Sequence, residues 1–283
     1  MKKAFLGMGL LGSSFVKAMS KRGEQVQVWN RTTSKAAELE AVGAKAFTSV
    51  KEAVQGANRI HLTLKDDASV DEVLDAAAGG LAPDTIIVDH TTTSKEGAIR
   101  RTAYWKEKGF TYLHAPVFMG PANALESTGY MLVSGDKEVI SRLAPELSAM
   151  TGKLIDLGPE AGKAAAMKLA GNTFLVCFTF GLRETLGVGK ALDITADDLL
   201  SLLQDWNPGA QVQDRLKKLA AADHTEPSWE LSMARKDTQL FLDAARVSEI
   251  NLTLLPTIAA LMDEWIAKGF GNHDWTIVGE DYK

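Results

Sequence analysis

Several residue types are scarce in this chain of 283 residues, and each scarcity excludes a class of protein. Cys177 is the only cysteine, so no disulfide can form within the chain. The five histidines lack metal-ligand spacing, and we expect no metal site. The 31 basic residues are outnumbered by 36 acidic ones, which gives a net charge of −5. This balance indicates no surface for nucleic acid or anionic lipid.

Long apolar runs are also scarce. The amino terminus enters a strand pattern at once, without the apolar core and cleavage site of a secretory signal, so we expect a cytoplasmic protein. Residues 164–182 are nearly all apolar and long enough to cross a membrane. Lys168 and Asn172 lie inside this segment, and a lysine in hydrocarbon costs about 3 kcal/mol. We interpret it as a buried helix and expect no membrane partner.

Short apolar strands and amphipathic helices alternate over the first 158 residues. The expected strands are residues 3–6, 25–29, 59–64, 85–89, 112–117, 130–134 and 153–157, and the expected helices include 33–42, 68–77, 96–108 and 137–150. Such alternation predicts an α/β fold with a parallel, doubly wound sheet of the Rossmann type.

The strand pattern stops near residue 160. Every later periodic segment indicates a helix: 160–190, 196–204, 208–222, 229–247 and 251–268. We therefore expect two domains, a nucleotide-binding domain at 1–159 and an all-α domain at 160–283. The long helix near 160–190 should join them.

Three glycines mark the turn between the first strand and the first helix. The stretch Gly7-Met8-Gly9-Leu10-Leu11-Gly12 fits the pattern G-x-G-x-x-G in its proper strand-turn-helix context. Helix-start amides face a pyrophosphate there, and the missing side chains allow close approach. We expect these six residues to bind a dinucleotide, the alternative being a glycine turn without a ligand.

The second strand ends at VWNRTTSK, where an NAD-binding domain usually has an acid for the ribose 2′-hydroxyl. Asn30 and Arg31 stand there instead, followed by Thr32 and Lys35. A guanidinium binds a 2′-phosphate that a carboxylate would repel, so these residues indicate NADP(H). The alternative is that Arg31 is an ordinary solvated charge. We also expect Leu64, at the end of the strand 59–64, to bind the cofactor.

Lys168 lies among apolar neighbours, where an unpaired charge is costly to bury. Asn172 follows four residues later, on the same face of the expected helix. A protonated lysine can stabilise and protonate the oxyanion that forms when hydride reaches a carbonyl. We expect Lys168 to be the proton donor and Asn172 to position it. The alternative is a lysine that extends along the helix surface to water.

With these motifs, the chain resembles the β-hydroxyacid dehydrogenases of the 3-hydroxyisobutyrate dehydrogenase-like and 6-phosphogluconate dehydrogenase-like type, over essentially its whole length. FLGMGLLG and VWNRT resemble the family's NADP fingerprint, and GKAAAMKLAGN resembles the helix with the catalytic lysine and asparagine. The resemblance assigns Thr92 of DHTTTS and Lys236 of KDTQLFLDAA to the nicotinamide end. The closest functional type is a glyoxylate or succinic semialdehyde reductase.

The substrate segment departs from the family pattern D-A-P-V-S-G-G. HAPVFMG places Phe118 and Met119 where the family has serine and its first glycine, and His114 where it has aspartate. The lysine helix has Ala164 in place of a glycine. A phenylalanine removes the hydroxyl that a substrate carboxylate would use, so acid recognition is in question. We expect Phe118, Met119 and Gly120 to line the substrate pocket, with core packing of the first two as the alternative.

The resemblance implies an NADP-dependent oxidoreductase acting on CH–OH and C=O groups, with a small carbonyl compound or hydroxyacid as substrate. Two alternatives remain open: an imine reductase-like enzyme on the same fold, and a non-catalytic NADP-binding interaction module. The resemblance also implies a homodimer or higher homo-oligomer. A second subunit or an intramolecular core would cover the apolar helix of residues 164–182.

Overall fold

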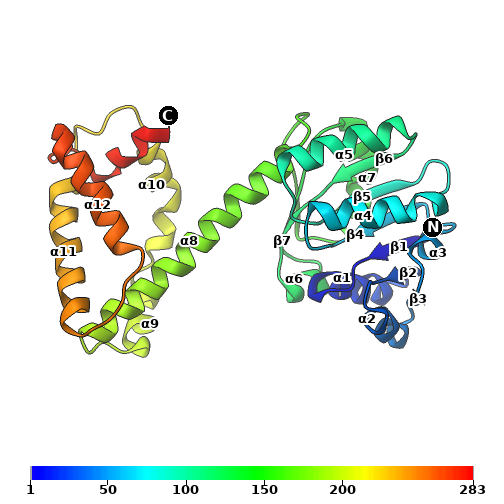
Figure 1. Ribbon diagram of the computed structural model, residues 1–283, viewed down its shortest axis with the longest axis horizontal. Coiled ribbons are helices and arrows are strands. Elements are labelled where there is room, and N and C mark those ends of the chain that lie inside the picture. The colour runs from blue at the N-terminus through cyan, green and yellow to red at the C-terminus, as the bar shows by residue number, and fades with distance from the viewer. Residues whose placement is uncertain (1, 283) are drawn as a thin grey trace. The chain divides into compact units, whose positions relative to one another are not determined.

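The computed structural model describes residues 2–282 (Figure 1). Internal contacts divide the chain into two units inside the helix α8 (Lys163–Ala191), between Thr173 and Phe174. Residue 160, where the sequence places the start of the second domain, lies just before α8. The boundary at 159 stays a prediction.

The first unit is built on a six-stranded parallel sheet. Its strands are β1 (Lys3–Leu6), β2 (Val26–Trp29), β3 (Lys45–Phe47), β4 (Arg59–Leu62), β5 (Ile86–Asp89) and β6 (Thr111–His114). They lie in the order β3-β2-β1-β4-β5-β6. The order reverses between β1 and β4, and ligands of open α/β sheets bind at the carboxyl ends of the strands beside such a reversal.

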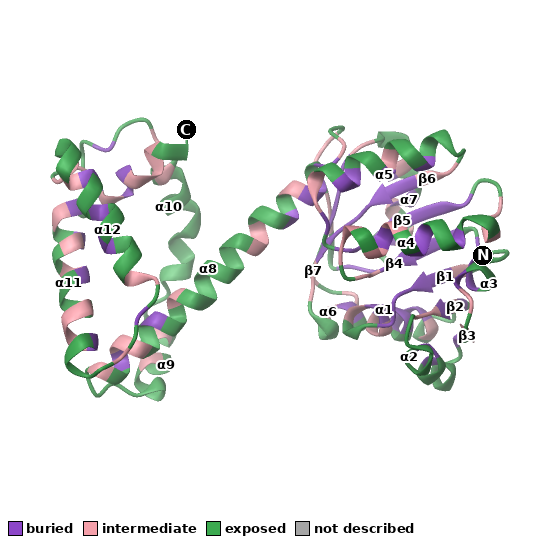
Figure 2. Ribbon diagram, viewed as in Figure 1, coloured by how far each residue is buried: buried purple, intermediate pink, exposed green. Residues whose placement is uncertain are grey.

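Helices cover both faces of this sheet because its strands are apolar on both sides. Within β1, Phe5 belongs to one buried cluster, and Ala4 and Leu6 belong to the other, as the two-residue period of a strand requires. The helices are α1 (Leu10–Lys21), α2 (Thr33–Ala37), α3 (Val50–Val54), α4 (Asp67–Ala77), α5 (Lys95–Glu107), α6 (Pro121–Glu126) and α7 (Lys137–Ser148). Figure 2 shows the strands buried beneath exposed helix surfaces. The predicted α/β fold class is confirmed.

Three of the expected strand segments contribute to a second sheet. It contains β7 (Val117–Phe118), β8 (Tyr130–Val133) and β9 (Lys153–Asp156), with β7 antiparallel to β8. The expected strand at 112–117 is broken after β6, because Pro116 has no N–H with which to continue the ladder. Segments 130–134 and 153–157 were expected in the main sheet, but they pair with each other in the second sheet as β8 and β9.

The second unit contains helices. They are the rest of α8, α9 (Ala196–Asp205), α10 (Val212–Leu219), α11 (Leu231–Val247) and α12 (Leu255–Trp265), with short helical turns at Pro208–Gln211, Ile266–Phe270 and Trp275–Tyr282. Leu231, Ala234, Met262, Trp265 and Ile277 form its core. The buried carboxylate of Glu184 on α8 accepts hydrogen bonds from the backbone N–H groups of Thr253, Leu254 and Leu255 at 3.0–3.2 Å. It thereby caps the start of α12.

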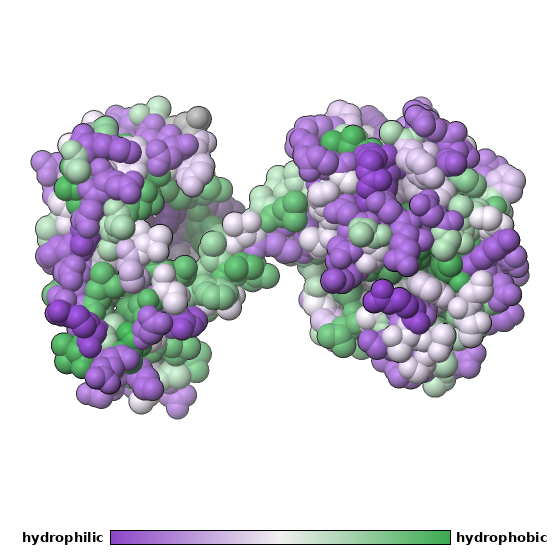
Figure 3. Space-filling model, viewed as in Figure 1, coloured by the Kyte–Doolittle hydropathy of each residue, from purple (hydrophilic) through white to green (hydrophobic). Residues whose placement is uncertain are grey.

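The apolar helix α8 is exposed over most of its length. By length and composition it could cross a membrane, yet only 11% of its most apolar 18-residue stretch is buried. Phe174, Leu175 and Val176 are each more than half exposed, and Figure 3 shows apolar residues along this helix. Within residues 2–282 a single copy thus leaves most of this apolar surface exposed, and the sequence leaves open whether the chain itself or a second subunit covers it. The apolar surface of α8 needs another cover.

Candidate functional site

The glycine turn after β1 is fixed by close packing at two of its three glycines. Gly7 has φ +96°, and a Cβ there would overlap the carbonyl oxygen of Thr63. A Cβ on Gly12 would overlap the Gly7 carbonyl oxygen and come within 2.6 Å of Thr63 Oγ1. A Cβ on Gly9 would meet no atom of residues 2–282 within 4 Å. The bare backbone at Gly9 thus faces open space at the start of α1, where a pyrophosphate fits.

A cavity of about 470 Å³ opens at the carboxyl ends of β1, β2 and β4. Its lining includes Gly7, Gly9, Asn30, Arg31, Thr32, Lys35, Leu64 and Lys65. Arg31, Thr32 and Lys35 are exposed, as groups that meet a ligand phosphate should be. The cation Lys65 was missed from the sequence, although its place just after β4 at the sheet's binding edge was a usable signal.

Asn30 links the glycine turn to the loop after β2. Its Oδ1 accepts a hydrogen bond from the Met8 backbone N–H at 2.9 Å, and its Nδ2 donates to the Thr32 carbonyl oxygen at 2.9 Å. The Met8 side chain is buried in the core. Asn30 therefore positions the loop of Arg31 and Thr32 against the turn.

A second cavity of about 290 Å³ adjoins the first, since Gly9, Thr63, Leu64 and Lys65 line both. Leu10, Leu11, Gly12, His90, Thr91 and Thr92 complete its wall. The Leu64 backbone N–H donates to Thr91 Oγ1 at 2.9 Å, which joins the ends of β4 and β5. One extended ligand can thus reach from Arg31 past the glycine turn to Thr92. These residues fit a dinucleotide.

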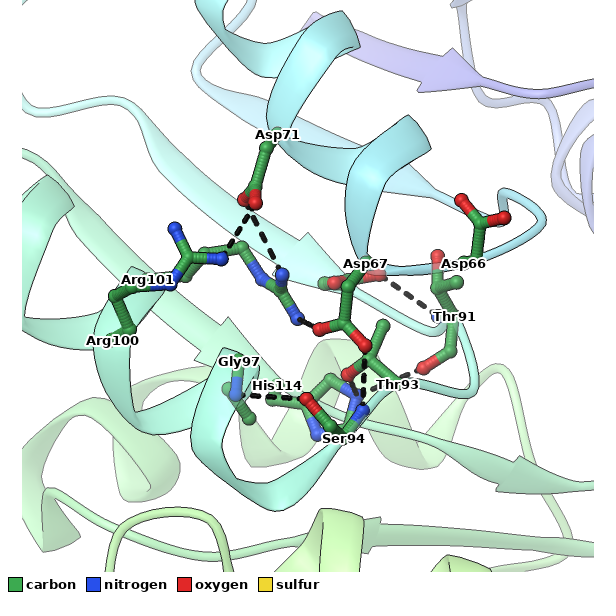
Figure 4. A network of polar contacts seen from close by, with 12 residues as sticks. Asp66, Asp67, Asp71, Thr91, Thr93, Ser94, Gly97, Arg100, Arg101 and His114 are labelled. Atoms are coloured by element: carbon green, nitrogen blue, oxygen red, sulfur yellow. Dashed lines mark hydrogen bonds and ion pairs between the residues drawn. The ribbon is translucent and has the colours of Figure 1, made fainter.

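The loop that carries Thr92 is held by the polar network of Figure 4. Arg101 is 1% exposed and binds Asp67 at 2.7 Å, whose other oxygen accepts from the Ser94 backbone N–H at 2.9 Å. His114 Nε2 lies 2.8 Å from the Thr91 carbonyl oxygen. Burial lowers the pKa of His114, so the neutral ring donates from Nε2. His114, which stands where the resemblance leads us to expect an aspartate, therefore holds this loop in place.

Lys168 and Asn172 meet on α8 as their spacing predicts. Lys168 Nζ donates to Asn172 Oδ1 at 2.9 Å, and Lys168 is 8% exposed. Nζ also lies 4.3 Å from the centre of the Phe118 ring. Burial lowers the pKa of this ammonium, and no carboxylate within residues 2–282 offsets that effect. A lysine of this kind can release a proton more readily than a solvated one.

The three residues predicted to line the substrate pocket have different surroundings in the structure. Phe118, in β7, faces Lys168, whereas Met119 packs against the core of the first unit. The Gly120 backbone N–H donates to Asn123 Oδ1 at 2.9 Å, and Asn123 Nδ2 donates to Thr128 Oγ1 at 3.1 Å. The Gly120 amide is thus already paired within its own loop.

Lys236 lies in the second unit, on α11. Its ammonium pairs with Asp237 Oδ1 at 2.7 Å, and its side chain is 57% exposed. Its assignment to the nicotinamide end, like the other site roles, stays a prediction.

Comparison with known proteins identifies the family of the nucleotide-binding region. Residues 2–158 match the family model described as the NAD binding domain of 6-phosphogluconate dehydrogenase. The chain is 26% identical to the NAD-dependent L-serine dehydrogenase of Pseudomonas aeruginosa, over 97% of this chain and 95% of the relative. It is 28% identical to the chloroplastic glyoxylate/succinic semialdehyde reductase 2 of Arabidopsis thaliana, over 95% of this chain and 75% of the relative.

A solved structure of similar fold is the imine reductase of Myxococcus stipitatus in complex with NADP+. It has a TM-score of 0.91 and 22% identity, with all of both chains covered. At this identity the likeness shows the fold alone. The family model and the full-length relatives decide the classification: the chain is an oxidoreductase with an NAD(P)-binding domain and belongs to the β-hydroxyacid dehydrogenase family.

Proposed function

We propose that this protein is an NADPH-dependent reductase that converts a small aldehyde or ketone to the alcohol, with Lys168 as the proton donor. The observation that carries the proposal is the buried ammonium of Lys168, hydrogen-bonded to Asn172 in the unit that holds the dinucleotide cavities. A lysine without a carboxylate partner is costly to bury. Its presence is explained if negative charge develops beside it during reaction.

NADP(H) is the proposed cofactor because of the charges around the first cavity. Arg31, Lys35 and Lys65 line it, and Asn30 replaces the acid that would favour NAD. Proteins similar to this chain use both cofactors, since the Pseudomonas aeruginosa relative is named as NAD-dependent and the imine reductase of the same fold is in complex with NADP+. Arg31 is the residue on which the choice depends.

When bound, NADPH supplies the hydride that reduces the carbonyl carbon. Lys168 Nζ gives its proton to the carbonyl oxygen as negative charge develops there, and it regains a proton from solvent. Asn172 Oδ1 holds the ammonium in place through its hydrogen bond. Thr92 and Lys236 would position the nicotinamide end, and Phe118 to Gly120 would line the substrate pocket.

The proposal includes a homodimer or higher homo-oligomer. The exposed apolar residues of α8 and an apolar cavity of about 360 Å³ in the second unit, lined by Leu192, Leu199 and Ile258 among others, both need a cover. A second copy supplies one by a symmetric contact. Light scattering should give a mass of at least twice 30.5 kDa, and the mass of a single chain would exclude the proposed oligomer. The expected cytoplasmic location belongs to the same proposal.

An imine reductase is the second candidate. Phe118, in place of a serine, gives the pocket an apolar wall, and the fold is shared with an imine reductase. Lys168 favours the carbonyl substrate, because an iminium cation would meet an ammonium of the same sign.

The test is a panel of carbonyl compounds and a cyclic imine, with oxidation of NADPH and NADH measured in parallel. We expect carbonyl reduction with NADPH to be fastest. Faster reduction of the imine would favour the second candidate. Tight NADPH binding without turnover of any compound would indicate a non-catalytic module.

A further inference from the structure

The Phe118 ring and the Lys168 ammonium form a close pair between β7 and α8. Nζ lies 4.3 Å from the ring centre, the distance of a cation–π contact. Asn172 Oδ1 accepts a hydrogen bond from the same nitrogen at 2.9 Å. The ammonium is therefore held between an aromatic face and an amide oxygen.

Gly171 provides the space for this ring. A Cβ on Gly171 would overlap Phe118 Cζ and come within 2.8 Å of Cε1. Lys168, Gly171 and Asn172 are three and four residues apart, so they lie on one face of the helix. The ring fits against that face only because position 171 has no side chain.

Neither residue 118 nor residue 120 offers a free donor to a substrate carboxylate. Phe118 has no hydroxyl, whereas the family pattern that this segment resembles has a serine at that place. The backbone N–H of Gly120 is already bonded to Asn123 Oδ1 at 2.9 Å. A carboxylate beside the ring would lose its hydration without gaining a hydrogen bond from residue 118 or from the Gly120 N–H.

We propose that Phe118 determines substrate specificity and directs this site to uncharged, apolar carbonyl compounds in place of carboxylate-bearing ones. The inference rests on the proposed function and names its substrate class. An alkyl or aryl substituent packs against the ring at no cost in hydration, and the carbonyl oxygen remains free to approach Lys168. The ring also keeps water from one side of the ammonium.

A matched pair of aldehydes tests the inference on the unaltered enzyme. Butanal and succinic semialdehyde have the same four-carbon chain, and a carboxylate in the second replaces a methyl group in the first. With NADPH, we expect kcat/KM to favour butanal by about tenfold or more, the scale of discrimination that a mismatched polar group produces. A preference for succinic semialdehyde would overturn the inference while leaving the reductase proposal in place.

Variants at position 118 identify the residue responsible. In Phe118→Ser the ratio of the two kcat/KM values should move by about tenfold toward succinic semialdehyde, because a hydroxyl donor returns. Phe118→Leu is the matched control that keeps an apolar side chain, and it should keep the preference for butanal. NADPH binding, measured by fluorescence, should be unchanged in both. An unchanged ratio in Phe118→Ser would overturn the role of the ring.

Gly171→Ala tests the same contact without altering Phe118. The added methyl group should displace the ring, and the pH dependence of kcat should shift as water reaches Lys168. An unaltered pH profile would contradict the contact. Failure of the unaltered enzyme to oxidise NADPH with either aldehyde or with any other carbonyl compound would overturn the proposed function, and this inference with it.

Discussion

Lys168 Nζ lies 2.9 Å from Asn172 Oδ1, one turn along the same helix, and this bond holds a buried ammonium in a single position. The amide oxygen can only accept, so the contact favours the protonated lysine. Burial acts in the opposite direction and lowers the lysine pKa. The pair thus combines a fixed proton with an increased tendency to release it, which suits a general acid.

Lys168→Ala should lower the turnover of carbonyl reduction by about a hundredfold or more, the contribution of a positioned general acid. NADPH affinity should stay nearly the same, because Lys168 does not line the dinucleotide cavities. Lys163→Ala is the matched control, since it removes an exposed lysine at the start of the same helix. Full activity of Lys168→Ala in steady-state kinetics would exclude the assignment.

The rate of reduction should depend on pH through the Lys168 ammonium. The acid must be protonated, so kcat should fall as the pH rises through a pKa below the ordinary value of 10.5. Alcohol oxidation needs the free base and should rise over the same range. Asn172→Ala removes a bond to the charged form and should move both profiles to lower pH. Profiles that coincide for the two proteins would contradict the role of Asn172.

Arg31→Asp should reverse the cofactor preference. The carboxylate would repel a 2′-phosphate and accept from a 2′-hydroxyl, so the KM for NADPH should rise by about tenfold or more relative to that for NADH. Lys21→Asp makes the same change of charge at the exposed end of α1. The preference of this control should be unaltered. The same ratio of the KM values for NADPH and NADH in both variants would show that Arg31 does not bind the 2′-phosphate.

Two glycines of the turn should respond differently to alanine. Gly12→Ala would force a methyl group onto the Gly7 carbonyl oxygen, and overpacking of this kind costs about 1–3 kcal/mol of unfolding free energy. In Gly9→Ala the added methyl group points into open space, so the urea unfolding midpoint should stay nearly unchanged. NADPH binding should weaken, because the methyl group occupies the space that the pyrophosphate would fill. Undiminished NADPH affinity in Gly9→Ala would contradict a pyrophosphate site there.

Glu184→Gln should destabilise the second unit by about 1.5–3 kcal/mol, the range for hydrogen bonds to a charged group. Burial raises the Glu184 pKa, but the N–H donors of Thr253, Leu254 and Leu255 more than offset it, so the pKa lies below 4.5. This stability is present above about pH 4.5 and is lost as the pH falls through the lower, folded-state pKa. Urea unfolding at pH 7 and at low pH measures both effects.

Glu264→Gln is the control for this change, because it removes an exposed carboxylate from α12 in the same unit. It should leave the unfolding midpoint almost unchanged at both pH values. A loss of stability equal to that of Glu184→Gln would point to net charge as the cause.

Much of the first unit was predictable because its signals are local. The glycine pattern and the alternation of strands and helices indicate the nucleotide-binding sheet, and the spacing of Lys168 and Asn172 predicts their contact. The elements β3, α3 and α6 were missed because segments of three to six residues are too short to show a period. The sheet to which Tyr130–Val133 belongs depends on pairing with distant strands.

Other features depend on contacts between residues far apart in the sequence. The contact of Phe118 with Lys168 joins positions 50 residues apart, so it appears in no local pattern. The apolarity of α8 was interpreted as burial, yet composition does not show whether the same chain or another copy covers a helix. Lys65 belongs to no motif, and its place just after β4 becomes informative once the strand order puts that strand end at the cavity.

The amide of Asn30 has a consequence for how cofactor selectivity can change. Its oxygen accepts a hydrogen bond from the Met8 N–H, and its nitrogen donates one to the Thr32 carbonyl oxygen, so each end of the amide makes its own contact. An aspartate is isosteric with asparagine. It would still accept the hydrogen bond from the Met8 N–H, but it would lose the bond to the Thr32 carbonyl oxygen and add a negative charge. In the proposed NADP(H) site, this change of one functional group would act against Arg31 by repelling a 2′-phosphate, and it would leave the hydrogen bond from the Met8 N–H in place.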